Sequence, residues 1–450
     1  MISVLTDSVS GPVLVPGDPG YAAEVAAFNT AVTHVPDVVV GVESVADVVE
    51  AVRFARENKY AVTVQATGHG AHVPVASGLL ISTRRLDEVR VDVGSRTATV
   101  GAGVRWGELI AAVAGTGLFP SPGSSTTVGV VGYLLGGGLG PLVRSHGFSS
   151  DYLLGLTVVS GTGEVLEVTA DSDPDLLWAL RGGKAGLGVV TSARLRLVEL
   201  ETLYAGSLFF AEEHMEAALR GWVDWVGSAD PMVSTSVAVM RFPSLDVVPE
   251  PLRGRCLLSL RFACPAGVDD GVRLAAPLRA LAPVYLDLLG ELPVSDFGRI
   301  HNDPPVPGPS YVRGALLTDA DQGFVSALLG QVGAGVEAPF VAVEVRHLGS
   351  AAGRDVDGGS AVGGRGAGFT LGLVGVEPAL LEIEVPAAAE RVVEAVGSWV
   401  AAETNVNFMG VPRSAGHFAS AWSVETFARL AEVRRRVDPD GVFGFGFAGA

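Results

Sequence analysis

The chain has 450 residues, of which 48% are hydrophobic and 18% are charged, so it is long enough for two or three domains and too apolar to be disordered. With 31 Lys and Arg against 49 Asp and Glu, the formal net charge is −18 and no basic cluster occurs, which argues against a nucleic-acid partner. The N-terminus lacks a signal-peptide pattern, no apolar run could span a bilayer, and two cysteines give no disulfide framework. We therefore expect a cytoplasmic protein without a membrane partner.

The first third of the chain mixes helical and strand-like segments. Residues 44–59 predict a helix, because Ser44 is a suitable N-cap for Asp47 three residues later and valines recur on one face. A strand over 60–67 follows, and residues 160–163 predict the turn of a β-hairpin. Further elements are expected as strands over 78–83, 89–93 and 97–104 and as a helix over 105–117. This mixture predicts an α+β fold.

The middle third has longer β-type runs, separated by helix-like stretches. They predict an antiparallel sheet with helices on one face. The runs cover residues 232–242, 254–264, 339–349 and 368–376. The glycine-rich segment 350–368 predicts a flexible loop. The chain returns to a helix over 423–437 and ends in a loop over 438–450.

Three glycine-rich segments carry the chemistry of the first 190 residues: QATGHG at 65–70, 123–140 and 181–190. Glycines let backbone N–H groups approach a polyanion without interference from side chains. In the first segment His69 stands between two glycines, without close side-chain neighbours. Each segment alone is also explained by packing turns, and His69 by a solvent-facing turn. Together they favour a large phosphate-bearing cofactor, whereas the scattered histidines give no metal site.

The ordered motifs identify a family. QATGHG, GSSTTVGVVGYLLGGGLG, GFSSDYLLGLTVV, LLWALRGGKAGLGVVT, NVNF and VDPDGVF together resemble the FAD-linked oxidases of the berberine bridge enzyme type, in the vanillyl-alcohol oxidase and p-cresol methylhydroxylase (PCMH) superfamily. The resemblance covers residues 28–200 and 400–445. It implies a PCMH-type FAD-binding domain in two parts, 1–205 and 396–450, around a substrate-binding domain over 206–395.

The resemblance also implies how FAD is held. The family histidine that bonds to the flavin 8α-methyl falls on His69, and Ser125 stands where many relatives have a second, cysteine link, so we expect one covalent bond only. Val128 matches the position above the flavin at which valine is associated with oxygen access. The resemblance places the FAD-binding residues at Gln65, Ala66, Thr67, Gly68, His69, Gly70, Gly123, Ser124, Ser125, Val128, Gly129, Gly132, Tyr133, Gly138, Gly188, Val189, Val190 and Asn407.

The catalytic base is the point at which the chain departs from the family. Relatives often have Y-V-N-Y, whose first tyrosine can deprotonate substrate, but this chain has Asn405 there and keeps Asn407. In FVAVEVRHL, alternation places Glu344 and Arg346 on the face that would look toward the flavin, opposite a valine face that meets the helices. A desolvated Glu344 would have a raised pKa and could accept a proton. The alternative is a Glu344–Arg346 pair on a wet sheet face.

The resemblance predicts an FAD-dependent oxidase of secondary metabolism that oxidises a small alcohol or natural-product intermediate and reduces dioxygen to hydrogen peroxide. Its candidate catalytic residues are Glu344, Arg346 and Asn407. Two flavin-dependent alternatives stay open: an oxygenating or cyclising enzyme, and a dehydrogenase with another acceptor. A third alternative is a binding protein that has kept the fold without catalysis. The sequence also leaves open whether Lys184 contacts the cofactor or faces solvent.

Overall fold

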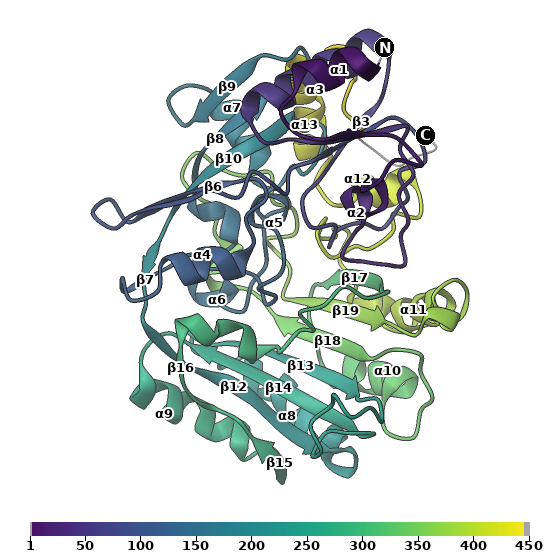
Figure 1. The fold of residues 1–450 in the computed structure, drawn as a ribbon. Coiled ribbons are helices and arrows are strands. Elements are labelled where there is room, and N and C mark those ends of the chain that lie inside the picture. Colours follow the sequence, from purple (N-terminus) through teal and green to yellow (C-terminus); the bar gives the residue numbers. More distant parts are fainter. Residues whose placement is uncertain (1, 445–450) are drawn as a thin grey trace.

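The structure, a computed structural model, describes residues 2–444 (Figure 1). Two smaller sheets with their helices fill the upper half of the view, and one large sheet with its helices fills the lower half. This mixture of helices and mainly antiparallel sheets confirms the predicted α+β fold. Among the described residues, no helix is both long and apolar enough to cross a membrane.

The first sheet is built from short, buried strands near the N-terminus. Its strand order is β1-β2-β4-β3, and both β2 and β3 pair with β4 in parallel. The elements are β1 Val13–Leu14, β2 Val38–Gly41, β3 Val62–Gln65 and β4 Leu79–Ser82, with α1 Ile2–Ser8, α2 Tyr21–Val25 and α3 Val45–Asn58. Ser44 caps α3 by accepting a hydrogen bond from the Asp47 N–H, as predicted.

The second sheet is antiparallel in the order β5-β6-β10-β8-β9 and carries the predicted hairpin, since β8 pairs with β9. The strands are β5 Val89–Asp92, β6 Thr97–Gly101, β8 Leu153–Val159, β9 Val165–Thr169 and β10 Val189–Arg196, and β7 Leu118–Phe119 pairs separately with β11 Val198–Glu199. The helices are α4 Trp106–Ala112, α5 Val130–Leu134, α6 Val143–His146 and α7 Pro174–Leu180, with the 3-10 turn η1 Ser149–Tyr152.

The end of the chain packs on this N-terminal half. The helix α13, Val424–Val437, begins at its N-cap Ser423 and lies beside α7, where Arg436 forms an ion pair with Asp173. A bridge between Val62 and Phe443 then joins the C-terminal segment to β3. The predicted helix over 423–437 is confirmed, and the predicted terminal loop is described as far as residue 444.

The large sheet has eight strands in one antiparallel array, in the order β15-β12-β14-β13-β18-β19-β17 with β16 paired to β12. They are β12 Thr202–Ala211, β13 Ser234–Arg241, β14 Cys256–Cys264, β15 Val284–Asp287, β16 Gly290–Pro293, β17 Tyr311–Leu317, β18 Ala342–His347 and β19 Phe369–Gly375. All four predicted runs are strands here. The strands β12, β15, β16 and β17 have no counterpart among the predicted strands.

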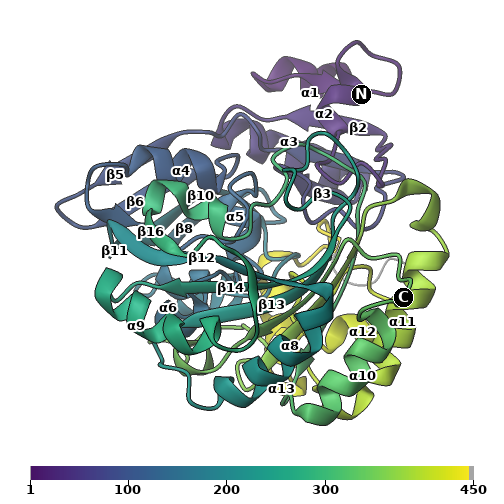
Figure 2. The ribbon, with the colours of Figure 1, turned by 90° about the horizontal axis from the view of Figure 1, so that it is seen from below.

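Helices cover one face of this sheet, as expected (Figure 2). They are α8 Met215–Val226, α9 Val268–Arg279, α10 Gln322–Val332 and α11 Glu384–Ala395. Val343 and Val345 of β18 are each 1% exposed and pack with them in one core. Glu344 and Arg346 therefore lie on the opposite face, and Arg346 Nη1 donates to Leu139 O of the N-terminal half at 3.1 Å.

The segment 350–368 is a loop after its first turn, as predicted, but it is packed against the rest of the chain. It begins with the 3-10 turn η4 Ser350–Gly353 and then packs against the N-terminal half. Ala361 is fully buried, and Arg365 forms an ion pair with Asp151 of η1. This packing was not predicted, because glycine content signals turns, whereas the contacts that hold this segment come from residues about 200 positions earlier.

Candidate functional site

His69 follows β3 directly, and its ring is held on three sides. The Phe28 ring stacks on it with a centroid distance of 3.7 Å and an interplanar angle of 16°. Its Nδ1 lies 2.8 Å from Thr67 Oγ1 and its Nε2 lies 3.0 Å from Thr127 Oγ1. The expectation of a histidine without close side-chain neighbours was therefore wrong, because its neighbours come from distant segments. Burial and the nearby Arg105 lower the pKa of His69 to about 4, so its imidazole is neutral at pH 7.

Two serine hydroxyls continue the hydrogen bonds around His69 along the loop before α5. Ser125 Oγ lies 3.0 Å from Thr127 Oγ1, and Ser124 Oγ donates to Asp303 at 2.8 Å. Ser125 is thus connected to the His69 ring through the Thr127 hydroxyl, which hydrogen-bonds with both. Val128 is half-buried and packs against the core of the second sheet.

Gly70, which adjoins His69, and Gly132 of α5 are both open positions. A side chain added at Gly70 or at Gly132 would meet no protein atom within 4 Å, and both glycines are exposed. At Gly68 a side chain would come within 2.6 Å of Ala27, and its φ of +73° favours glycine. A neutral imidazole next to a glycine whose missing side chain would meet no protein atom is an arrangement that fits a covalently attached flavin.

Other predicted FAD-binding residues have their side chains engaged in the protein. The Gln65 amide donates to Val25 O and Ala26 O, and the residue is 7% exposed. Val189 and Val190 pack into two different hydrophobic cores. These residues, with Ala66, Gly129 and the tightly packed Gly188, can offer a cofactor only backbone groups or small surfaces.

Tyr133 is enclosed by glycines. A side chain at Gly123 or Gly138 would come within 2.8 Å or 2.5 Å of its ring, and Trp106 packs against it edge to face at 5.8 Å. Burial raises the pKa of Tyr133, and its hydroxyl is buried. The two glycines are therefore explained by the packing of Tyr133, and the tyrosine serves as part of the wall.

Lys184 is half-buried, and its ammonium is hydrogen-bonded to other residues of the protein. Its Nζ donates to Gly132 O at 2.9 Å and to Asn407 Oδ1 at 2.6 Å, while Asn407 Nδ2 donates to Tyr133 O at 2.9 Å. Burial lowers the pKa of Lys184 to about 8. Asn407 thus joins the C-terminal segment to α5 and to the glycine segment 181–190.

Glu344 lies at the centre of a charged cluster on the open face of the large sheet. Its Oε1 accepts from Arg261 Nη1 at 2.9 Å and lies 3.2 Å from His301 Nε2, and its Oε2 accepts from Arg346 Nη2 at 2.9 Å. Ser236 also donates to it, at 2.6 Å. The Arg261, Arg346 and His301 side chains are 9%, 8% and 6% exposed and are buried, whereas the Glu344 side chain is 20% exposed and is only partly buried.

The cluster corrects the predicted role of Glu344. Burial alone would raise the pKa of Glu344, but the charges of Arg346 and Arg261 and the hydrogen bond with His301 hold it well below its usual range. The predicted raised pKa is wrong, because Arg261 pairs with Glu344 across 83 positions, and strand alternation, which places Arg261 opposite an apolar face, does not show that contact. Of the alternative, a Glu344–Arg346 pair on a wet sheet face, the pair is confirmed, but Arg346 is 8% exposed and donates to Leu139 O of the N-terminal half, so that face is not fully open to water.

The position of the family tyrosine holds no proton acceptor. Asn405 is 4% exposed, and its side-chain oxygen accepts the Asn407 N–H at 3.0 Å. Phe408 lies below Arg346, with 5.9 Å between the guanidinium carbon and the ring centre. The asparagine at 405 therefore shapes the turn that presents Asn407.

Several residues of this site were missed by sequence reasoning. Phe28, His301 and Asp303 contact predicted site residues but lie in loops without a recognisable motif, whereas Thr127 lies within the motif at 123–140 but was not singled out there. His301 follows the 3-10 turn η3, Val294–Ile300, and reaches Glu344 across 43 positions. The one sequence signal near Thr127 was Ser125, two residues earlier, which stands where many relatives have the second, cysteine link to the flavin.

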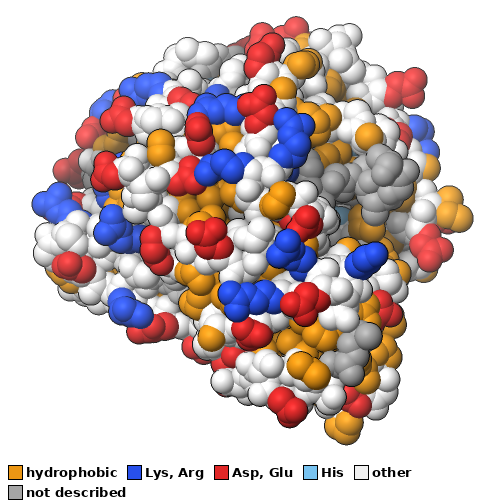
Figure 3. Space-filling model, turned by 90° about the horizontal axis from the view of Figure 1, so that it is seen from above, with side chains coloured by type: hydrophobic (Ala, Val, Ile, Leu, Met, Phe, Trp, Pro, Cys, Tyr) orange, Lys and Arg blue, Asp and Glu red, His pale blue; other side chains and the backbone are white. Residues whose placement is uncertain are grey.

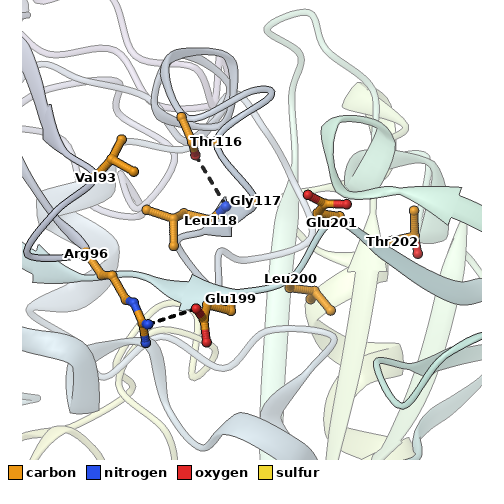
Figure 4. Close-up of a pocket in the computed structure, with 9 residues that line it drawn as sticks. All are labelled: Val93, Arg96, Thr116, Gly117, Leu118, Glu199, Leu200, Glu201 and Thr202. Atoms are coloured by element: carbon orange, nitrogen blue, oxygen red, sulfur yellow. Dashed lines mark hydrogen bonds and ion pairs between the residues drawn. The ribbon is translucent and has the colours of Figure 1, made fainter.

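An open groove of about 590 Å³ lies away from this site, where β7 and β11 meet the start of β12 (Figure 4). Arg96 and Glu199 form an ion pair of 2.9 Å on its wall. It shares no residue with the surface around His69. Seen from above, one face of the molecule carries charges of both signs, interspersed, beside a hollow (Figure 3).

Comparison with known proteins agrees with this geometry. Residues 36–169 match the family described as FAD binding domain. The chain contains an FAD-binding domain. The (R)-6-hydroxynicotine oxidase of Paenarthrobacter nicotinovorans is 32% identical over 289 residues, which cover 62% of this chain and 60% of that protein. The chain thus matches less than two thirds of the length of that relative.

Solved structures share the whole fold around this FAD-binding domain. Physcomitrella patens BBE-like 1 superposes with a TM-score of 0.84 at 19% identity, over 99% of this chain and 97% of that one. Glucooligosaccharide oxidase from Acremonium strictum, described with a 6-S-cysteinyl, 8α-N1-histidyl FAD, has a TM-score of 0.83 at 17% identity, over 98% and 97%. These findings confirm the predicted resemblance to the berberine bridge enzyme-like FAD-linked oxidoreductases, with FAD as cofactor.

Proposed function

We propose that the protein is an FAD-dependent oxidase whose flavin is bound covalently to His69 alone. The observation that carries this proposal is the fixed, neutral imidazole of His69 beside the open position of Gly70. A neutral ring has one nitrogen lone pair, which can bond to the flavin once the threonine hydroxyl on that nitrogen is displaced, and the two threonine hydroxyls hold the ring in one orientation until then. The covalent flavin named for glucooligosaccharide oxidase supports it.

The residues present fit FAD. Gly70 and Gly132 provide the open surface, and the loop over 123–129 and the start of α5 border it. Bound there, FAD would accept a hydride from the substrate and pass its electrons to dioxygen, which becomes hydrogen peroxide. Ser125 cannot form a thioether, which leaves His69 as the single attachment. Val128 lies in the same loop, and in this proposal its small side chain leaves dioxygen access to the flavin.

We propose that the charged cluster around Glu344 orients the substrate. Glu344 stays ionised and holds Arg261 and Arg346 in place, so Arg346 and the His301 ring present a fixed polar surface. Asn407, anchored by Tyr133 O and Lys184, keeps the C-terminal segment against the FAD-binding half. The low pKa of Glu344 removes it as the proton acceptor.

We propose a small alcohol or natural-product intermediate as substrate, with dioxygen as the second reactant and the cytoplasm as the location. The substrate-binding domain is assigned to 206–395, and the FAD-binding domain to 1–205 and 396–450. The strands of the large sheet, from Thr202 to Gly375, support this division. The absence of a base at Asn405 favours the alternatives, an oxygenating or cyclising enzyme or a dehydrogenase.

Peroxide release distinguishes the oxidase from these alternatives. Purified holoenzyme is tested with a panel of alcohols, sugars and cyclic amines, and oxygen uptake and peroxide are recorded together. An oxidase releases one peroxide per oxygen consumed. Oxygen consumption without peroxide, or reduction of an artificial acceptor without oxygen uptake, would instead establish the oxygenating enzyme or the dehydrogenase.

A further inference from the structure

Two buried arginines share one carboxylate on the open face of the large sheet. Arg261 and Arg346 each donate to Glu344 at 2.9 Å, and in the described part of the chain neither forms an ion pair with another acidic residue. Burial and the charge of Arg261 lower the pKa of His301, so its ring is neutral at pH 7 and adds no charge. The cluster therefore has an excess of positive charge, which is costly away from water unless a counter-charge is supplied.

Asp303 does not supply this counter-charge. Its negative charge acts on Arg346, but Asp303 is exposed and its carboxylate accepts a hydrogen bond from Ser124. Water around an exposed carboxylate weakens its attraction for a buried cation. The cluster thus keeps its excess positive charge.

Two polar atoms of the cluster are buried without a hydrogen-bond partner among residues 2–444. They are Arg346 Nε, whose N–H can only donate, and His301 Nδ1. His301 Nε2 lies 3.3 Å from Arg346 Nη2, and when it accepts from this donor the ring proton is on Nδ1, which then donates as well. Free donors beside an excess positive charge match the oxygen atoms of an anion.

A small cavity adjoins these groups where the large sheet meets the N-terminal half. Arg261, His301 and Arg346 line it on one side, and Gly140 and Pro141 line it on the other. Its volume is about 10 Å³, which is room for about one oxygen atom. A single oxygen of a larger anion therefore fits between the cluster and the glycine-rich segment.

The cluster also contacts the segment that contains the loop proposed to border FAD. Asp303 follows His301 by two residues and accepts from Ser124 of that loop at 2.8 Å. Arg346 donates to Leu139 O, near the end of the segment 123–140, at 3.1 Å. Both contacts hold the cluster against the FAD-binding half, where a substrate has to lie.

We infer that the substrate is an alcohol that carries a carboxylate, and that one carboxylate oxygen enters this cavity and accepts from Arg346 Nε. The inference rests on the proposed function, which it narrows to hydroxy acids. The carboxylate supplies the missing negative charge, while Glu344 holds Arg261 and Arg346 in place. An uncharged analogue would leave the excess charge of the cluster uncompensated, which disfavours it.

Calorimetric titration of the purified protein with its FAD measures this recognition without turnover. The probes are glycolate and mandelate, each compared with its uncharged amide, and sodium chloride as an inorganic anion. Three variants are titrated beside the wild type. Arg346→Met removes the free donor and the excess charge, Glu344→Gln increases the excess charge, and Arg90→Met, which removes an exposed arginine paired with Glu88, is the control.

We expect at least one of the two acids to bind at least tenfold more tightly than its amide. Its dissociation constant should rise at least tenfold in Arg346→Met, fall at least threefold in Glu344→Gln and stay unchanged in Arg90→Met. The opposite responses of the two cluster variants separate recognition of charge from a loss of structure, which would weaken binding in both.

Equal dissociation constants for each acid and its amide would overturn the inference, as would weaker binding in both cluster variants. Binding of chloride but of neither acid would overturn it too and would assign the cavity to an inorganic anion. Peroxide formed only from uncharged alcohols would overturn the inference and leave the proposed function intact. Protein that takes up no FAD would overturn the proposed function, whichever acids it binds.

Discussion

The rings of Phe28 and His69 lie parallel, with their centres 3.7 Å apart and 16° between their planes. The two residues are 41 positions apart in the sequence. The backbone Phe28 N–H donates to Thr67 O, two residues before His69, so a backbone hydrogen bond holds the two segments together beside the stacked rings. This contact sets the plane of the imidazole that we propose to carry the flavin. Aromatic pairs of this kind contribute about 0.5–1.5 kcal/mol beyond the area they bury.

Phe28→Leu should reduce covalent attachment. Without the aromatic partner the His69 ring can tilt, so we expect at least a twofold lower fraction of acid-stable flavin. The backbone hydrogen bond to Thr67 is kept in this variant, so the fold should be unaffected. Phe28→Tyr is the matched control and should retain the wild-type fraction, measured as flavin absorbance in the washed acid precipitate. Equal fractions in all three proteins would show that the stack plays no part.

Glu344→Gln should destabilise the protein by about 3 kcal/mol, because it leaves Arg261 and Arg346 buried without their counter-charge. Urea unfolding at pH 7 measures the difference. Since the pKa of Glu344 is lowered in the folded state, its contribution is complete above the usual carboxyl pKa and is lost as the pH falls through the folded value. The difference between the two proteins should therefore shrink in acid.

The surface glutamate Glu216 provides the control for this variant. It pairs with Arg220, but its side chain is 64% exposed, so Glu216→Gln should change the stability by no more than about 0.5 kcal/mol. If both variants unfold at the same urea concentration, the cluster around Glu344 contributes no more than an exposed ion pair.

The stability of the protein should fall as the pH drops from 7 to 5. Burial lowers the pKa of His72 to about 4 and that of His347 to about 3, whereas both have a pKa near 6.5 when unfolded. Below pH 6.5 the unfolded chain binds more protons than the folded one, which costs about 2 kcal/mol per histidine at pH 5. His347→Gln should make the pH dependence shallower by that amount in urea titrations. An unchanged dependence would show that His347 is accessible to protons in the folded protein.

Capping, hairpin and strand-face patterns were predictable from the sequence because they depend on residues within a few positions. Ser44 and Asp47 indicated the start of α3, and alternation placed Val343 and Glu344 on opposite faces of β18. The partners of Glu344 were not predictable in the same way. Arg261 and His301 come from other elements, and they reverse the direction of its pKa shift.

The strand β12 was not predicted from the sequence, for a different reason. Most of its ten residues are buried on both faces, so the run lacks the alternation that indicates a strand with one solvated face. The FAD-binding residues were located through the resemblance. The structure then shows which of them turn their side chains inward, as Gln65 and Val189 do, and this depends on packing partners that are far away in the sequence.

Val128→Leu should slow the reaction of the reduced flavin with oxygen at least tenfold. The larger side chain would occupy the space beside the proposed flavin surface, where Val128 is half-buried. The measurement is stopped-flow reoxidation of chemically reduced protein, which needs no substrate, and Val128→Ala serves as the control with a rate no slower than the wild type. Similar rates in Val128→Leu and wild type would remove Val128 from the oxygen path.

The most direct test of the account is whether flavin stays with the polypeptide after denaturation. Purified yellow protein is precipitated with acid and run on a denaturing gel under ultraviolet light, together with His69→Ala and Ser125→Ala. The account predicts fluorescence on the wild-type and Ser125→Ala bands and none on the His69→Ala band. Flavin that remains in the wild-type supernatant, or fluorescence that persists in His69→Ala, would contradict a single histidyl bond at His69.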